Sequence, residues 1–141
     1  MAKKNGKRAQ QKRSDQDQAV VVVCRGGDCG SRHKHPQTDH QGQLRRIRDG
    51  VEPAAQVIVS RCLDACDHSN VVVILPDAAG RAEGAGPVWI GEANDADTTQ
   101  DIIDWVTAGQ PAGPGRPALV DIREFTPTRQ SRHELDHEAI P

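Results

Sequence analysis

The residues of this chain best able to do chemistry are its four cysteines, which form two pairs. Cys24 and Cys29 have the spacing C-x4-C, and Cys62 and Cys66 have the spacing C-x3-C. Thiolate is a soft ligand that suits iron–sulfur clusters and tetrahedral zinc. The cysteines therefore predict a metal centre with all four as ligands.

The spacing within each pair separates the possible metal centres. Zinc ribbons usually use two C-x2-C knuckles, although spacings of two to four residues are tolerated, and the thioredoxin-type redox motif is also C-x2-C. Neither pair here has that spacing. A two-iron cluster is wider than one ion, and glycines 26, 27 and 30 let backbone N–H groups approach its sulfurs. The spacing favours a [2Fe–2S] cluster, and leaves a structural four-cysteine zinc site and redox-active thiols as alternatives.

Other side chains near the cysteines could act on a cluster or could be ordinary loop residues. Four basic residues could offset the negative charge of a cluster and raise its reduction potential, or could simply be exposed loop residues: Arg25, Arg32, Lys34 and Arg61. Four histidines could replace a thiolate, as in Rieske-type centres, but more often serve as polar loop residues or hydrogen-bond donors to ligands: His33, His35, His40 and His68.

Each cysteine pair directly follows a predicted strand. Residues 19–24 are a valine run typical of a strand buried on both faces, and residues 56–60 form a second strand. Between them, Thr38 and Gln41 predict the start of a helix, with an apolar face from Leu44 onward and an end at Gly50. A strand–helix–strand unit favours parallel pairing, so both cysteine loops should emerge at the same end of the sheet.

The rest of the central segment completes an α/β fold. Strands are predicted at 71–75 and 88–91 as an antiparallel pair, with an exposed turn or loop at 78–86. A second helix should begin at Asp97 or Thr98, bury residues 102, 103 and 106, and end at Gly109. Trp89 and Trp105 should lie in the core. We expect one mixed sheet of about four strands with two main helices and flexible tails.

Charge and composition divide the chain into three parts. Residues 1–18 form a basic arm of net charge +4 that should be disordered, and residues 19–110 form a domain of net charge −5. Residues 111–141 read as a Pro/Gly-rich linker and C-terminal extension, with an edge strand expected at 119–125. The arm lacks interleaved aromatic residues, so nucleic acid is an unlikely partner. The acidic run from Glu92 to Asp104 is either a solvated helix face or a docking patch for a basic partner.

Several functional classes are disfavoured. No apolar run approaches the roughly 20 residues that span a bilayer, and the N-terminus lacks a signal-peptide stretch, so we expect a cytoplasmic protein. Thiols stay reduced there and available to metals. Walker and Rossmann glycine patterns are absent, and Ser60, Ser69 and Asp39 lack the spacing of a hydrolase site. The chain is therefore not expected to be an enzyme.

Several sequence segments together resemble the thioredoxin-like [2Fe–2S] ferredoxin family. They are VVVCRGGDCG, SRCLDAC, NVVVILPD, PVWIGEANDAD and IIDWV, and the resemblance spans about Val20 to Gly109. It implies a thioredoxin-like fold and four cysteine ligands, Cys24, Cys29, Cys62 and Cys66. It also implies one-electron transfer to unidentified redox partner proteins and, in some relatives, a homodimer. Where the family often has Gly-Pro after the fourth cysteine, this chain has residues 67–70, DHSN.

Overall fold

The computed structural model describes residues 17–138 and 140, so most of the predicted basic arm lies outside the described residues. It contains a five-stranded sheet in the order β2-β1-β3-β4-β5. The strands are β1 (Ala19–Cys24), β2 (Ala55–Ser60), β3 (Val72–Leu75), β4 (Val88–Ile90) and β5 (Glu124–Phe125). β1 and β2 are parallel, and the other neighbours are antiparallel, as predicted for β3 and β4.

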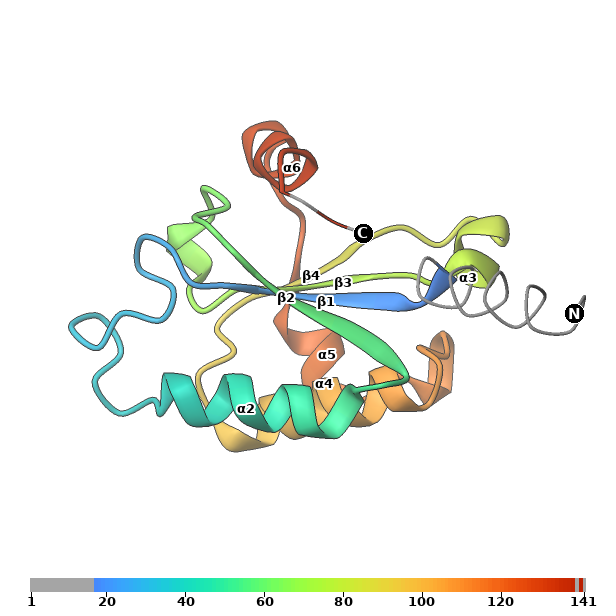
Figure 1. Cartoon of the computed structure of the whole chain (residues 1–141), viewed down its shortest axis with the longest axis horizontal. Helices are drawn as coiled ribbons and strands as arrows, with labels where there is room; N and C mark the ends of the chain where they lie inside the picture. The colour runs from blue at the N-terminus through green and yellow to red at the C-terminus, as the bar shows by residue number, and fades with distance from the viewer. Residues whose placement is uncertain (1–16, 139, 141) are drawn as a thin grey trace, which may run out of the picture.

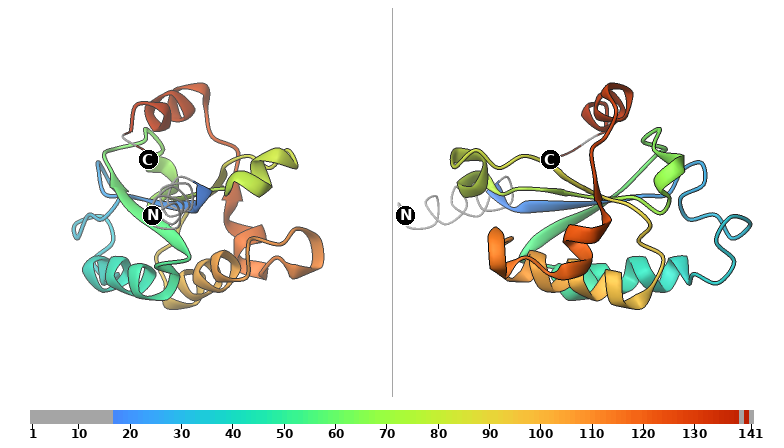
Figure 2. Two further views of the ribbon diagram at one scale, coloured as in Figure 1. Left: turned by 45° about the vertical axis from the view of Figure 1, so that its right-hand side comes forward. Right: turned by 180° about the vertical axis from the view of Figure 1, so that it is seen from behind.

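The helices cover the two faces of the sheet unequally. α2 (His40–Val51), α4 (Ala96–Thr107) and α5 (Ala118–Arg123) lie on one face, and α6 (Arg129–Asp136) lies on the other (Figures 1 and 2). A short helix, α3 (Ala78–Ala82), and two 3-10 turns, Cys66–His68 and Gly113–Gly115, complete the described elements. The α/β class with a mixed sheet is confirmed, and it is broadly consistent with a thioredoxin-like arrangement.

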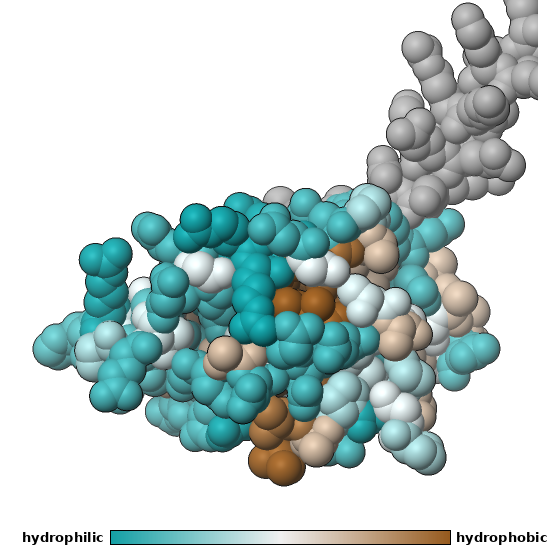
Figure 3. All heavy atoms as spheres, turned by 90° about the horizontal axis from the view of Figure 1, so that it is seen from below, coloured by the Kyte–Doolittle hydropathy of each residue, from teal (hydrophilic) through white to brown (hydrophobic). Residues whose placement is uncertain are grey.

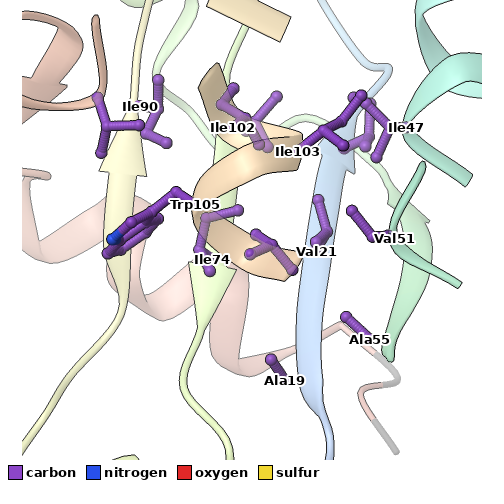
Figure 4. Packing of buried hydrophobic residues seen from close by; sticks show 14 of the residues in the cluster. Ala19, Val21, Ile47, Val51, Ala55, Ile74, Ile90, Ile102, Ile103 and Trp105 are labelled. Atoms are coloured by element: carbon purple, nitrogen blue, oxygen red, sulfur yellow. The ribbon is translucent and has the colours of Figure 1, made fainter. Parts of the chain in front are cut away.

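The valine run of β1 lies at the centre of two hydrophobic clusters. All six residues of β1 are buried, because alternate side chains point to opposite faces and each face is covered. Val21 and Val23 pack with the isoleucines of α2 and α4 on one face (Figure 4). Val20, Val22 and Cys24 pack on the other face with Leu135 of α6. The first cysteine is therefore part of the α6-side core. Both tryptophans are buried, as predicted.

The helix boundaries differ from prediction where two good capping residues compete. The N-cap of α2 is Asp39, whose carboxylate accepts from the Gly42 N–H, whereas Thr38 donates its hydroxyl to the Asn94 carbonyl. α4 likewise begins two or three residues early, after Asp95. α2 ends at Val51, one residue after Gly50, and a Cβ on Gly50 would lie 2.6 Å from Ile103 of α4. Glycine at this position allows close packing of the two helices.

Two segments expected to be irregular or extended contain helices. The loop predicted at 78–86 includes α3, which begins where the Asp77 carboxylate accepts from the Gly80 N–H. The edge strand predicted at 119–125 is mostly the helix α5, and only Glu124 and Phe125 pair with β4. The predicted boundary at 110/111 between a domain and an extension stays a prediction.

Seen from the side of α2 and α4, the surface is mostly hydrophilic, with hydrophobic residues in small groups (Figure 3). The large hydrophobic residues exposed on the described part of the chain are Val59 and Ile122. No helix within that part combines the length and the apolar character needed to cross a bilayer.

Candidate metal centre

The parallel pairing of β1 and β2 places the two cysteine loops at the same end of the sheet. The register aligns Cys24 with Ser60, and the Arg25 N–H donates to the Ser60 carbonyl at 3.1 Å. The loop after β1 and the loop after β2 then run side by side at one end of the molecule (Figures 1 and 2). The convergence expected from the strand order is confirmed.

The four sulfurs are arranged as two close pairs. The Sγ atoms of Cys62 and Cys66 are 3.7 Å apart. The thiols of Cys24 and Cys29 share a hydrogen bond, which lowers the pKa of Cys24 to about 6 and raises the pKa of Cys29. The Cys62 and Cys66 sulfurs are thus in contact, and the Cys24 and Cys29 thiols shift each other's pKa.

The pairs also influence one another electrostatically. Negative charge on Cys66 raises the pKa of Cys29, although less than the Cys24 thiol and burial do. Negative charge on Cys24 adds a small increase to the pKa of Cys62, which is raised mainly by burial. Such repulsion between thiolates is relieved when they bind a cation, because metal coordination requires the deprotonated form.

Backbone N–H groups point at the cysteine sulfurs. The Asp64 N–H donates to Cys62 Sγ at 3.4 Å, and the Val71 N–H donates to Cys29 Sγ at 3.3 Å. Backbone hydrogen bonds from the loops around Gly26 and Leu63 lower the pKa of Cys24. Donors of this kind stabilise thiolate and tune the potential of a metal centre held by it.

Glycine is required where the first loop crosses the second. A Cβ on Gly27, whose φ is +59°, would lie 2.7 Å from Cys66 Sγ and 3.2 Å from Cys62 Sγ. A Cβ on Gly26 would lie 2.2 Å from the backbone nitrogen of Cys62. The backbone of the glycine loop therefore lies directly against the Cys62–Cys66 pair, as the glycine content of this loop led us to expect.

The two pairs differ in exposure. Cys24 and Cys29 are 1% and 5% exposed, whereas Cys62 and Cys66 are partly exposed. Cys66 also lines an open polar cavity of about 630 Å³, together with Asp28, Lys34, His35, Asp67, Ser69, Glu92, Asn94, Asp95 and Arg123. Cys24 and Cys29, the inner pair, are therefore shielded from water, and Cys62 and Cys66, the outer pair, lie at the surface.

A buried asparagine joins the first cysteine loop to β3. Asn70 is fully buried; its Oδ1 accepts from the Gly30 N–H at 2.8 Å, and its Nδ2 lies 3.1 Å from His40 Nδ1. The Asn70 N–H donates to Asn94 Oδ1. Because Gly30 and Val71 directly follow Cys29 and Asn70, this network fixes the position of Cys29.

Among the four predicted basic residues, Arg25 has the closest relation to the cysteines. Its guanidinium donates to the carbonyls of Cys24 and His40 and to Gln43 Oε1. Burial lowers the pKa of Arg25, while charge on Cys29 and Cys24 raises it. Arg32 and Lys34 are exposed. Arg61 is also exposed and lies 3.9 Å from a Glu138 carboxylate oxygen.

The four histidines have partners or positions other than the sulfurs. His35 hydrogen-bonds Ser69 through Nε2, His40 bonds Asn70 and the His35 carbonyl, and His68 stacks on Phe125 with ring centroids 3.9 Å apart. His33 is exposed. These contacts match the polar-loop interpretation of the histidines.

Some carboxylates of the acidic run after β4 form ion pairs or hydrogen bonds within the protein. Glu92 pairs with Arg123 at 2.9 Å, Asp101 accepts from the Leu119 N–H, and Asp104 accepts from Gln100. Asp95 and Asp97 are exposed at the start of α4. The run therefore supports the packing of α5 as well as presenting charge to solvent.

The contribution of α6 was not anticipated from the sequence. Ser131 donates its hydroxyl to the Asp64 carbonyl, and Leu135 is buried in the same cluster as Cys24 and Cys29. Glu138 accepts from the Arg61 N–H. The C-terminal helix thus covers the second cysteine loop. The available signal was Thr128 as an N-cap followed by Ser131 and Leu135 on one helix face.

Within residues 17–138 and 140, no three His, Cys, Asp or Glu side chains form a group of the kind that holds a single metal ion. Comparisons of the chain with protein families, with curated proteins and with solved structures gave no match. The resemblance to [2Fe–2S] ferredoxins therefore stays a hypothesis, to be judged on the chemistry of the cysteine site.

Proposed function

We propose that the chain binds one [2Fe–2S] cluster through Cys24, Cys29, Cys62 and Cys66 and acts as a one-electron carrier. The observation that carries this proposal is the meeting of two thiol pairs at one end of the sheet. When bound, the cluster supplies reversible one-electron chemistry, and no bond of a substrate is made or broken. The chain therefore acts as a carrier and not as an enzyme.

The residues fit a two-iron group in the arrangement of their donors. Two thiolates bound to one tetrahedral metal at about 2.3 Å are about 3.8 Å apart, and the Cys62 and Cys66 sulfurs are separated by 3.7 Å. A two-iron cluster takes its four ligands as two such pairs, whereas a single zinc ion needs all four sulfurs around one point. The paired arrangement thus favours the cluster over structural zinc.

The surroundings of the sulfurs also suit a negatively charged redox group. The N–H groups of Asp64 and Val71 already donate to sulfur, and Arg25 supplies a nearby positive charge. Because Gly27 has no Cβ, space remains beside the sulfurs of Cys62 and Cys66. Together these residues would exclude bulk water from the inner pair and favour uptake of an electron.

The partly exposed Cys66 supports a route for the electron. It lines the polar cavity described above, whose wall carries more acidic than basic residues. A redox partner protein with a basic surface would approach here, because complementary charge speeds encounter. The proposed setting is the cytoplasm, where thiols stay reduced. Formation of a homodimer stays a prediction.

Optical and magnetic spectra of anaerobically purified protein test the proposal. The proposal predicts a red-brown protein that bleaches with dithionite and then gives an S = ½ electron paramagnetic resonance signal. Cys62→Ser should lose the visible absorption while circular dichroism stays unchanged. A colourless wild-type protein that contains one zinc per chain would overturn the proposal in favour of the structural zinc site.

A further inference from the structure

Two exposed histidines of the C-terminal segment form a second constellation, separate from the cysteines. His133 lies in α6, and His137 is the C-cap of that helix. Their Nε2 atoms are 2.9 Å apart, and their rings meet edge to face with centroids 4.4 Å apart. Both side chains are exposed. Nothing in the cysteine site or its proposed function uses this pair.

The helix presents the pair outward from a fixed support. Ser131 and Leu135 lie one helical turn apart on the buried face, where they contact Asp64 and the cysteine-side core. His133 and His137 follow each of them by two residues, which is about 200° around a helix and so on the opposite face. The inner contacts hold the helix, and the outer face stays open to solvent.

The contact between the two rings matches two ligands on one metal ion. At 2.9 Å the two Nε2 atoms are within hydrogen-bond distance, so one ring donates its N–H to the other, and a cation can take the place of that shared proton. Nitrogens in cis positions at about 2.1 Å from a metal are about 3.0 Å apart in square or octahedral coordination, and about 3.4 Å apart in a tetrahedron. The observed separation fits the square or octahedral case, which Ni²⁺ and Cu²⁺ prefer.

The residues around the pair suit a cation. Residues 133–138 include three carboxylates, Glu134, Asp136 and Glu138, whereas the arginines of α6, Arg129 and Arg132, precede the histidine pair. The sequence His133-Glu134-x-x-His137 is also the helical pattern that binds zinc in metalloproteases. Here both imidazoles are exposed rather than enclosed with a substrate, so this pattern indicates binding and not hydrolysis.

We propose that His133 and His137 form a surface binding site for a late first-row divalent cation of the Ni²⁺ or Cu²⁺ type. The two Nε2 atoms are the protein ligands, and water fills the other positions. Because His133 lies within α6 and His137 at its end, a bound ion bridges the last turn and stabilises the helix that covers the second cysteine loop. The site is independent of what the cysteines bind.

Calorimetric titration of the full-length, anaerobically purified protein with Ni²⁺ tests this site. The compared proteins are wild type, His133→Gln, His137→Gln and, as a matched control, His33→Gln, which changes an exposed loop histidine. The cysteines are present in all four proteins, so any binding to them cancels in the comparison. Mg²⁺, which prefers oxygen ligands, serves as the negative ion.

We expect Ni²⁺ affinity to fall by about an order of magnitude or more in His133→Gln and His137→Gln, and to stay unchanged in His33→Gln. Ni²⁺ should also raise the melting temperature of wild type and His33→Gln, but not of the other two proteins. Equal Ni²⁺ binding by all four proteins, or an equal loss in His33→Gln, would overturn the proposal. The substituted residues are exposed, and circular dichroism before titration verifies that each variant is folded.

Discussion

The backbone of Gly27 lies so close to Cys66 that a Cβ on Gly27 would come within 2.7 Å of the cysteine sulfur. This contact joins the loop after β1 to the loop after β2 at the partly exposed cysteine pair. The positive φ of Gly27 is part of the same arrangement, since it turns the first loop across the second. The contact is specific enough to test by adding one methyl group.

Gly27→Ala should prevent assembly of the metal centre, because the new methyl group occupies space beside Cys62 and Cys66. Gly84→Ala is the matched control, since Gly84 also has a positive φ but a Cβ there meets nothing within 4 Å. Both variants should lose about 1 kcal/mol of stability from the strained backbone. Visible absorption per chain should fall strongly in Gly27→Ala alone. Equal absorption in the two variants would show that Gly27 is not close to the bound group.

Arg25→Gln should make the reduction potential more negative, because it removes a positive charge that interacts with Cys24 and Cys29. The expected shift is on the order of 50 mV, from Coulomb's law at an effective dielectric constant of about 20. Arg25→Lys keeps the charge and should stay near the wild-type potential. Arg32→Gln changes an exposed residue and should shift it little. Potentials come from anaerobic dye titration, and a potential unchanged in Arg25→Gln would contradict the assigned role.

Asn70→Ala should destabilise the protein even without metal. It leaves the Gly30 N–H and the His40 ring nitrogen buried without the partners they have now. Because buried polar groups without hydrogen bonds are costly, the free energy of unfolding should fall by about 2–4 kcal/mol. Urea denaturation of the metal-free protein measures it, with Gln41→Ala as an exposed control. A loss no greater than that of the control would mean that the Asn70 network contributes little.

Metal-free protein should contain one unusually acidic thiol. The pKa of Cys24 is lowered to about 6 by its hydrogen bond with Cys29, so its thiolate absorption in the far ultraviolet should appear near that pH. Because the folded-state pKa lies below the unfolded value, this thiolate adds stability at pH 9 that is lost as the pH falls through 6. The pKa of Cys29 is raised instead. Its contribution to stability is therefore fully present below pH 9 and is lost as the pH rises above 9.

Cys29→Ala removes the largest cause of the low Cys24 pKa and should move the first thiolate step upward. An ultraviolet titration of metal-free wild type and Cys29→Ala makes the comparison. An identical first step in the two proteins would show that the thiols of Cys24 and Cys29 do not share a hydrogen bond.

The sequence predicted the fold best where local pattern and tertiary packing agree. The valine run of β1 and the apolar face of α4 were recognised from the pattern of apolar residues, and the parallel pairing with β2 from the helix between the strands. From these the convergence of the cysteine loops followed, because parallel neighbours end at the same edge of a sheet.

Prediction failed where distant contacts decide the outcome. Gly50 was expected to end the helix, yet α2 continues to Val51, and the glycine instead lets Ile103 of α4 pack closely. Residues 129–136 are polar apart from Leu135, so the helix α6 becomes recognisable only once Ser131 and Leu135 are seen against the cysteine loop. Asn70 looked like an ordinary loop residue, since its partners Gly30 and His40 are far away in the sequence.

Chemical analysis of iron, acid-labile sulfide and zinc in anaerobically purified protein tests the central claim most directly. Four thiols arranged as two pairs predict two irons and two sulfides for each chain, with zinc well below one. One zinc for each chain without sulfide, or a protein that retains no metal and keeps four titratable thiols, would contradict the electron-carrier proposal.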